Sequence, residues 1–199
     1  MKEFFGRKIL KYQDQIFRDL KTLVAIPSVA DASAARRPFG ERSAETLRWI
    51  LNRARELGLD TVNVGDYAGH AEYGGGEAVA AVVTHVDVVP AGEGWTGDPS
   101  VLEKRGGRLY GRGTADDKGA AVVALYCLKA LKDEKVKCVR KARAIFGAGE
   151  EIASDDLKQY FQREALPELA FTPDAEYGVC NREKGILHVE LSAPADGSR

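Results

Sequence analysis

Residues 78–89 read AVAAVVTHVDVV, and this stretch decides the fold. It is an almost continuous run of alanine and valine, which is typical of a strand buried on both faces of a sheet. The run ends at Pro90, where a loop rich in glycine and proline begins. Strands of this kind occur in sheets that helices cover on both sides, so the stretch predicts an α/β protein.

Helical patterns lie on both sides of this strand. We predict helices over residues 4–24, 41–57 and 118–132, and a further helix that begins at Ser154, with Ser154 as the cap and Asp155 and Asp156 in the first turn. The first of them ends before Pro27, and the second is followed by Gly58, where a helix C-terminal glycine belongs. Each helix would cover one face of the predicted sheet.

Further stretches read as strands. These are residues 61–66, the buried run 142–149 (ARAIFGAG), a short strand at the start of 169–177 (LAFTPDAEY) and a last strand over 185–193 (GILHVELSA). Two short strand-like runs flank Gly106 and Gly107, which predicts a hairpin. Apolar strands interleaved with amphipathic helices predict an α/β sandwich.

Composition limits the function classes. The chain has 199 residues, with 29 Lys and Arg against 30 Asp and Glu, so it lacks the positive field that nucleic acid or an anionic membrane requires. No run approaches the roughly 18 apolar residues of a membrane span. The N-terminal stretch lacks a signal-peptide pattern, and the three cysteines form no disulfide or zinc framework. We therefore expect a cytoplasmic protein that binds neither nucleic acid nor membrane.

Acidic residues and one histidine follow the predicted strands. They are His85 and Asp87, Asp116 and Asp117 in a glycine-rich loop, Glu150 and Glu151, and Asp174. Ligands of open α/β sheets bind beyond the carboxyl ends of the strands, so these side chains are expected to meet there. Imidazole and carboxylate groups together indicate a divalent-metal site.

The spacing within this set suggests separate roles. His85 and Asp87 are two residues apart and would face the same side of an extended backbone, so Asp87 could orient the imidazole. A carboxylate such as Asp116 could bridge two cations. Glu150 and Glu151 point opposite ways on a strand, which favours one as a ligand and the other as a base that takes a proton from water.

Each cluster also has a purely structural interpretation. A lone histidine after a strand often packs in a core, an acidic pair often caps a helix, and a Glu–Glu pair is often solvated surface. A nucleotide-binding protein is a further alternative, but residues 111–119 (GRGTADDKG) lack a phosphate-binding glycine or lysine pattern. Only the coincidence of the clusters at strand ends favours the metal site.

At these residues the chain resembles the M20 family of metallopeptidases. The segments 84–95 (THVDVVPAGEGW), 109–119 (LYGRGTADDKG), 149–151 (GEE) and 173–176 (PDAE) resemble the four metal-site motifs of that family, in the same order. Residues 67–77 and 171–185 look like its peptidase V and Sapep-type dipeptidase branch. The resemblance implies a three-layer α/β sandwich with a mixed, mostly parallel sheet, as in zinc-exopeptidase-like catalytic domains, incomplete at the C-terminus.

The resemblance also implies a role for each site residue. His85, Asp116 and Asp174 would hold one metal ion, and Asp116 and Glu151 a second, with Zn, Mn or Co as the two divalent ions. Glu150 would be the general base and Asp87 would orient His85, and the Asp116–Asp117 peptide bond would be cis. The implied reaction is hydrolysis of a dipeptide amide bond by an activated water. An N-acyl-amino-acid deacylase or aminoacylase of the same family and a non-catalytic metal-binding remnant are alternatives.

One expected ligand is missing from the chain. In the family, a histidine from a more C-terminal segment completes the second metal site, and neither His70, in a predicted loop, nor His188, in the last predicted strand, matches it. Residues 1–182 therefore resemble the N-terminal part of the catalytic domain, and residues 183–199 the start of a truncated lid domain. Such a chain would expose a sheet edge, which favours self-association.

Overall fold

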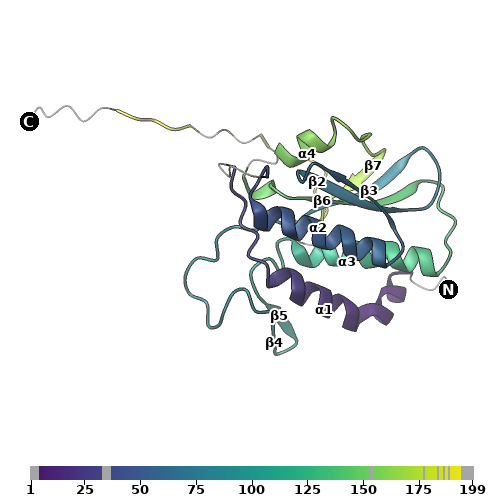
Figure 1. Ribbon diagram of the computed structural model, residues 1–199, viewed down its shortest axis with the longest axis horizontal. Coiled ribbons are helices and arrows are strands. Elements are labelled where there is room, and N and C mark those ends of the chain that lie inside the picture. Colours follow the sequence, from purple (N-terminus) through teal and green to yellow (C-terminus); the bar gives the residue numbers. More distant parts are fainter. Residues whose placement is uncertain are drawn as a thin grey trace, which may run out of the picture.

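A five-stranded sheet organises the protein. The computed structural model describes residues 5–32, 37–152, 155–176, 178–182, 184–185, 187 and 189–193. The strands lie in the order β1 (Asp60–Val64), β2 (Ala68–Tyr73), β6 (Lys141–Gly147), β3 (Val79–His85) and β7 (Leu169–Phe171) (Figure 1). The apolar run of residues 78–89 contains β3, which lies between β6 and β7, next to the edge of the sheet.

The sheet is mixed. β3 pairs in parallel with β6 and β7, whereas β2 pairs antiparallel with β1 and β6. Among the strands described, β2 alone therefore runs against the other four, which confirms a mixed, mostly parallel sheet. The parallel strands β6, β3 and β7 end at one edge, where the predicted site residues follow them.

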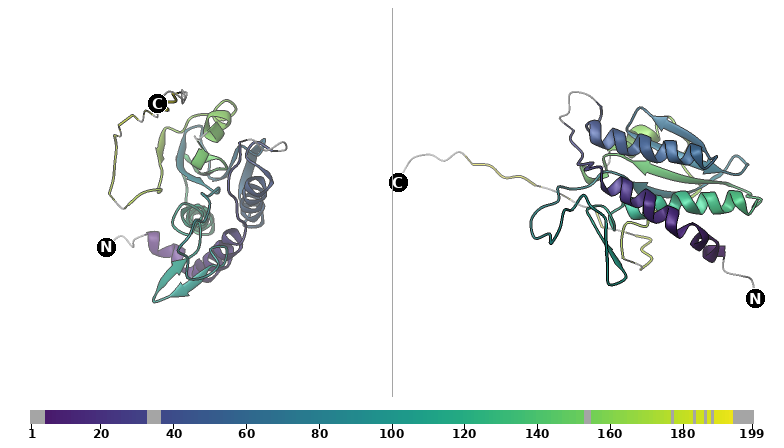
Figure 2. Two further views of the ribbon diagram at one scale, coloured as in Figure 1. Left: turned by 90° about the vertical axis from the view of Figure 1, so that its left-hand side faces the viewer. Right: turned by 60° about the horizontal axis from the view of Figure 1, so that its bottom comes forward.

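Helices cover both faces of the sheet. The helices α1 (Gln13–Val24), α2 (Glu41–Glu56) and α3 (Lys118–Asp133) lie on one side, and α4 (Asp155–Tyr160) lies on the other (Figures 1 and 2). Side chains alternate along β6 accordingly: Ala144 and Phe146 pack in the larger core under α2 and α3, whereas Ile145 packs in a smaller core with Tyr160 of α4. The three-layer α/β sandwich is thus confirmed.

The predicted hairpin is also present. It consists of β4 (Glu103–Arg105) and β5 (Arg108–Tyr110), joined by Gly106 and Gly107. Both glycines have positive φ angles, of 56° and 77°, which side-chain-bearing residues rarely adopt. The turn therefore requires the glycine pair that identified it in the sequence.

The predictions at the N-terminus and around His70 need correction. The predicted helix 4–24 begins as a 3-10 helix, η1 (Phe5–Tyr12), before α1. His70 lies in β2, not in a loop, and its ring accepts or donates a hydrogen bond with Tyr160 at 2.7 Å. The strand was missed because alanine, glycine and charged residues have weak strand preferences, and pairing with β1 and β6 compensates for them.

The last predicted strand is also wrong within the described residues. Residues 185, 187 and 189–193 carry no strand, and Val189 and Leu191 are exposed. Alternating apolar residues form a strand only when a neighbouring strand supplies hydrogen bonds, and none of the described segments pairs with this one. The predicted positions Ser154 and His188 lie outside the described residues.

Lys118 fastens the start of α3 to the end of α1. Its side chain is fully buried, and Nζ donates hydrogen bonds to the carbonyl oxygens of Leu23, at 2.9 Å, and Ile26, at 2.7 Å. Burial lowers the pKa of this lysine to about 8, although the negative charge of Asp87 acts to raise it. The contact holds in place the segment that carries Asp116.

We expect Lys118→Met to destabilise the protein by about 2 kcal/mol, because it leaves two buried carbonyl groups without donors. The matched control is Lys129→Met in the same helix, whose ammonium pairs with Asp133 and lies 6.0 Å from the centroid of the Tyr12 ring, and which should change stability by less than about 1 kcal/mol. Urea unfolding of the two variants measures the difference. Equal midpoints would show that the two hydrogen bonds contribute nothing.

Candidate metal centre

Three predicted ligands converge at the carboxyl edge of the sheet. Nε2 of His85 lies 3.0 Å from Oδ1 of Asp116 and 3.4 Å from Oδ2 of Asp174. One donor atom from each residue lies within 4.8 Å of the other two. A nitrogen and two carboxylate oxygens at this separation can contact one divalent ion.

The topology explains why residues so far apart in sequence meet. His85 ends β3, and Asp174 follows β7, the parallel neighbour of β3. Asp116 comes from the loop that connects β5 to α3, next to a cis peptide bond between Asp116 and Asp117. Parallel neighbours end at the same edge, so the pairing of β3 with β7 brings two of the ligands together.

The environment of His85 sets its protonation. Its ring is buried, and Nδ1 lies 3.1 Å from the carbonyl oxygen of Asp87 and 3.2 Å from its Oδ1. Burial lowers the pKa of His85, but the hydrogen bond and charge of Asp87 and the charges of Asp117 and Asp174 outweigh it and raise the pKa to about 10. The acceptors at Nδ1 leave Nε2 directed at the other two carboxylates.

Asp87 contacts both halves of the site. Besides its contact with His85, its fully buried carboxylate accepts hydrogen bonds from the backbone N–H groups of Glu150, at 3.2 Å, and Glu151, at 3.1 Å. The sequence indicated the contact with His85 and gave no sign of the contact with the glutamates. The turn of the chain after β6 brings the two segments together.

Glu150 and Glu151 lie in a short 3-10 helix, η2 (Glu150–Ile152). They therefore do not follow the alternation of a strand.

The surroundings of the two glutamates favour their protonated forms. Burial raises the pKa of Glu150, and so do the negative charges of Asp174, Asp87 and Asp156. The positive charge of His85 lowers it. The pKa of Glu151 is raised by burial and by Asp116. Oε1 of Glu151 is buried without a hydrogen-bond donor, as expected of an oxygen that awaits a cation.

Asp117 is a site residue to which the sequence assigned no role. It is fully buried, and its Oδ2 accepts a hydrogen bond from the backbone N–H of His85 at 3.2 Å. Burial, with the charges of Asp174 and Asp116, raises its pKa to about 7 against the charge of His85. Its position directly after Asp116 was the only available signal.

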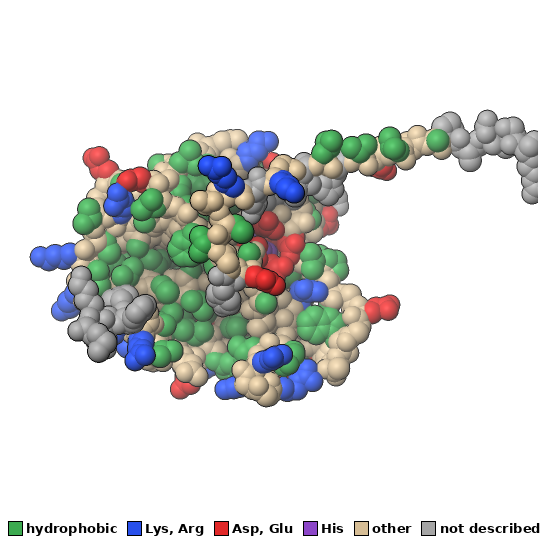
Figure 3. Space-filling model, turned by 180° about the vertical axis from the view of Figure 1, so that it is seen from behind, with side chains coloured by type: hydrophobic (Ala, Val, Ile, Leu, Met, Phe, Trp, Pro, Cys, Tyr) green, Lys and Arg blue, Asp and Glu red, His purple; other side chains and the backbone are tan. Residues whose placement is uncertain are grey.

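Acidic side chains gather on the face shown in Figure 3, next to the point where the C-terminal segment leaves the body of the molecule. The donor set there, one imidazole with several carboxylates, suits zinc, manganese or cobalt. The crowding of negative charge and the buried free oxygen of Glu151 both fit a divalent cation.

None of the described helices is long and apolar enough to cross a bilayer.

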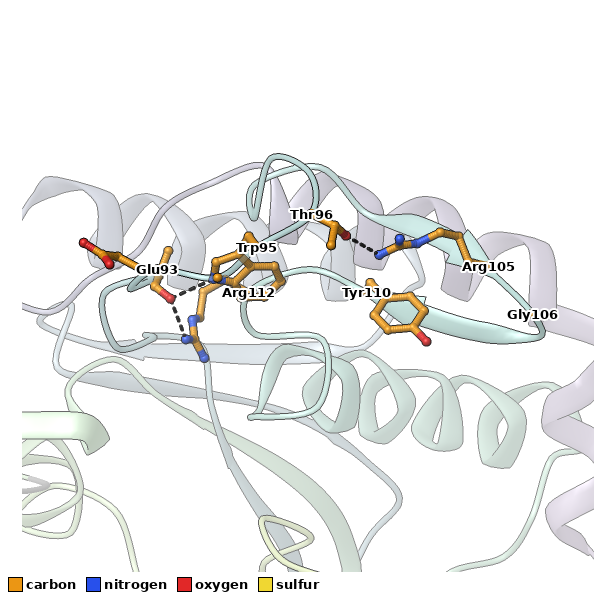
Figure 4. A pocket seen from close by; sticks show the side chains of 9 residues that line it. Glu93, Trp95, Thr96, Arg105, Gly106, Tyr110 and Arg112 are labelled. Atoms are coloured by element: carbon orange, nitrogen blue, oxygen red, sulfur yellow. Dashed lines mark hydrogen bonds between the residues drawn. The ribbon is translucent and has the colours of Figure 1, made fainter.

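A cavity of about 700 Å³ lies beside the hairpin, between β4–β5 and the loop 91–96 (Figure 4). Arg112 packs over the ring of Trp95, and both donate to the carbonyl oxygen of Ala91. Arg105 packs over Tyr110 and donates to Thr96. None of the predicted metal ligands lines this cavity, and the sequence did not indicate it.

The fold and the ligand cluster define an α/β protein with a candidate divalent-metal site at the carboxyl ends of parallel strands. The profile of Peptidase family M20/M25/M40 matches residues 81–195, which is more than half of the chain. The chain belongs to this family.

The relatives carry peptidase names. The chain is 38% identical over 190 residues to a Beta-Ala-Xaa dipeptidase of Lactobacillus delbrueckii subsp. lactis, covering 94% of this chain and 40% of that protein. Its structure resembles human carnosine dipeptidase 1, with a TM-score of 0.68 and 25% identity over 80% of this chain and 37% of the other. The chain spans about 40% of the length of the curated relatives that it matches.

A more distant neighbour shares the fold alone. The YXEP protein of Bacillus subtilis, described as a dinuclear metal binding peptidase from the M20 family, has a TM-score of 0.59 at 16% identity, over 81% of this chain and 43% of that one. The resemblance supports the three-layer architecture.

Proposed function

We propose that this chain carries metal-binding and catalytic residues of a metal-dependent hydrolase that cleaves the amide bond of dipeptides. The observation that carries the proposal is the convergence of His85, Asp116 and Asp174 within 4.8 Å. Membership of the M20 family and the dipeptidase names of the relatives support the choice of reaction.

We assign His85, Asp116 and Asp174 to one divalent ion, and Asp116 with Glu151 to a second. When bound, such ions make water more acidic and polarise an amide carbonyl. The free Oε1 of Glu151 and the three-residue cluster support this assignment. The site with a nitrogen donor and two carboxylates should bind its ion more tightly than the site with two carboxylates alone.

Glu150 is proposed as the general base. Its carboxylate accepts a proton from the attacking water and returns it to the departing amine nitrogen. A pKa raised by burial and neighbouring carboxylates suits a group that must both take and give a proton near neutral pH. Asp87 holds His85 and the backbone of Glu150 in one arrangement.

The substrate test uses the chain with Zn²⁺, Mn²⁺ or Co²⁺. We expect hydrolysis of dipeptides with a free amino group, β-alanyl dipeptides among them, and loss of activity with EDTA. Cleavage of N-acetyl amino acids alone would favour a deacylase. Metal binding without turnover of either substrate would support the non-catalytic alternative for this chain.

Three further properties belong to the same proposal. We assign residues 1–182 to the catalytic domain and residues 183–199 to the start of a second domain.

The apolar edge at β7, where Leu169 and Phe171 are 57% and 62% exposed, favours self-association. A cytoplasmic location is supported by three cysteines without disulfide partners.

Metal affinity should rise with pH. His85 has a pKa of about 10 in the metal-free protein, so its ring carries a proton at neutral pH that an ion at Nε2 must displace. We expect the apparent Kd for Mn²⁺ to fall by about tenfold per pH unit between pH 6.5 and 8.5. Calorimetry in buffers of different ionisation enthalpy measures the proton released. A Kd independent of pH would show that the ion displaces no proton from His85.

A further inference from the structure

The turn that bears Glu150 and Glu151 is held by two buried carboxylates. Asp87, from the end of the β3 segment, accepts the N–H groups of both glutamates. Asp156, from α4, accepts the N–H of Gly149 at Oδ2, at 3.0 Å. Three consecutive backbone donors are thus bound by carboxylates that come from two different segments of the chain.

Asp156 is buried and closely packed. Its side chain is fully buried, and Oδ1 accepts the N–H of Leu157 at 2.7 Å. A Cβ atom at Gly147 would lie 2.3 Å from Oδ2 of Asp156, so only glycine there lets the carboxylate reach Gly149. The sequence predicted Asp156 to be a helix cap like its neighbour, and its contact with the turn depends on this close approach.

The neighbouring Asp155 provides the contrast. It has the same charge in the same turn of α4, but it is exposed, and within the described part of the chain it pairs with Lys158, at 3.6 Å. Burying a carboxylate is costly unless N–H donors compensate for the lost water. Asp156 is buried at the turn of the candidate site and loses its water there, whereas Asp155 keeps its water at the surface.

We propose that Asp156 is a positioning residue for the candidate metal centre. Through Gly149, it fixes the turn so that the carboxylate of Glu151 reaches the second metal ion and that of Glu150 faces the site. This inference rests on the proposed function, which makes Glu151 a ligand. It predicts that loss of the Asp156 contact weakens one metal site and leaves the other intact.

The experiment compares Asp156→Asn with the matched control Asp155→Asn by titration with Co²⁺, followed by calorimetry and visible absorption. Asparagine replaces one carboxylate oxygen by an NH₂ group and so cannot accept from both Gly149 and Leu157. We expect the weaker Co²⁺ site of Asp156→Asn to lose about 10- to 100-fold in affinity, as on loss of other groups that orient ligands. The tighter site, and both sites of Asp155→Asn, should be unchanged.

A purely structural role gives a different result. If Asp156→Asn weakens both Co²⁺ sites alike, Asp156 supports the fold in general and the proposal is wrong. Unchanged binding at both sites also overturns it. If Asp156→Asn does not fold, Gly147→Ala displaces the same carboxylate while keeping its charge, and the selective loss is expected there instead.

Glu151→Gln separates this inference from the proposed function. If that variant loses the weaker site and Asp156→Asn does not, only the positioning role fails. If Glu151→Gln binds Co²⁺ as the parent chain does, or if the parent chain binds a single equivalent that Glu151→Gln retains, the assignment of Glu151 to a second ion fails together with the positioning role of Asp156.

Discussion

Glu150→Gln is expected to lower kcat for dipeptide hydrolysis by about 10²- to 10⁴-fold, the usual contribution of a general base. Glutamine has the same shape as glutamate but cannot accept a proton from water at neutral pH. The backbone N–H of residue 150 still donates to Asp87, so the turn should keep its place. Metal affinity should therefore be unchanged. Steady-state hydrolysis and a Co²⁺ titration of the same preparation measure both quantities.

Two controls define what the result means. Glu93→Gln, in the exposed loop beside the hairpin, removes one negative charge from a side chain that is neither a proposed ligand nor the proposed base, and it should leave kcat unchanged. Glu151→Gln should lose affinity for the second ion as well as activity. A Glu150→Gln protein that retained full activity would show that another group accepts the proton.

Asp116→Asn should weaken metal binding at both positions, by about 100-fold or more, since even groups that only orient ligands contribute about 10- to 100-fold. Asp116 Oδ1 lies 3.0 Å from Nε2 of His85, and the charge of Asp116 raises the pKa of Glu151. Asp116 is the one residue proposed as a ligand at both positions. Calorimetric titration with Zn²⁺ or Mn²⁺ gives the stoichiometry and both affinities.

The control for this variant is Asp98→Asn, whose exposed carboxylate accepts the N–H of Ser100 in the loop before the hairpin. It should bind metal as the parent chain does. Loss of only one ion in Asp116→Asn would mean that Asp116 is not shared between the two positions. Two ions bound with unchanged affinity would remove Asp116 from the ligand set.

Much of the fold follows from local patterns. The apolar run of β3, the periodicity of α2 and α3 and the glycine pair of the hairpin each have one dominant local cause, and each was predicted. β2 was missed because its strand conformation depends on two neighbours rather than on its own residues. The glycine at position 69 of that strand also depends on a neighbour, since a Cβ there would lie 2.6 Å from the carbonyl oxygen of Val62 in β1.

The candidate site divides in the same way. The sequence by itself determined which residue types follow the strands or lie in the glycine-rich loop: His85, Glu150, Glu151 and Asp174 in the first group and Asp116 in the second, a set whose chemistry suits divalent metal ions. Only the tertiary structure decided that Asp87 and Asp156 hold the glutamate turn, and that Asp117 is buried beneath His85. Ligand chemistry depends on side-chain identity, which is local. The hydrogen bonds of Asp87 join segments more than 60 residues apart and depend on how the strands pair, and the burial of Asp117 and Asp156 depends on what packs around them.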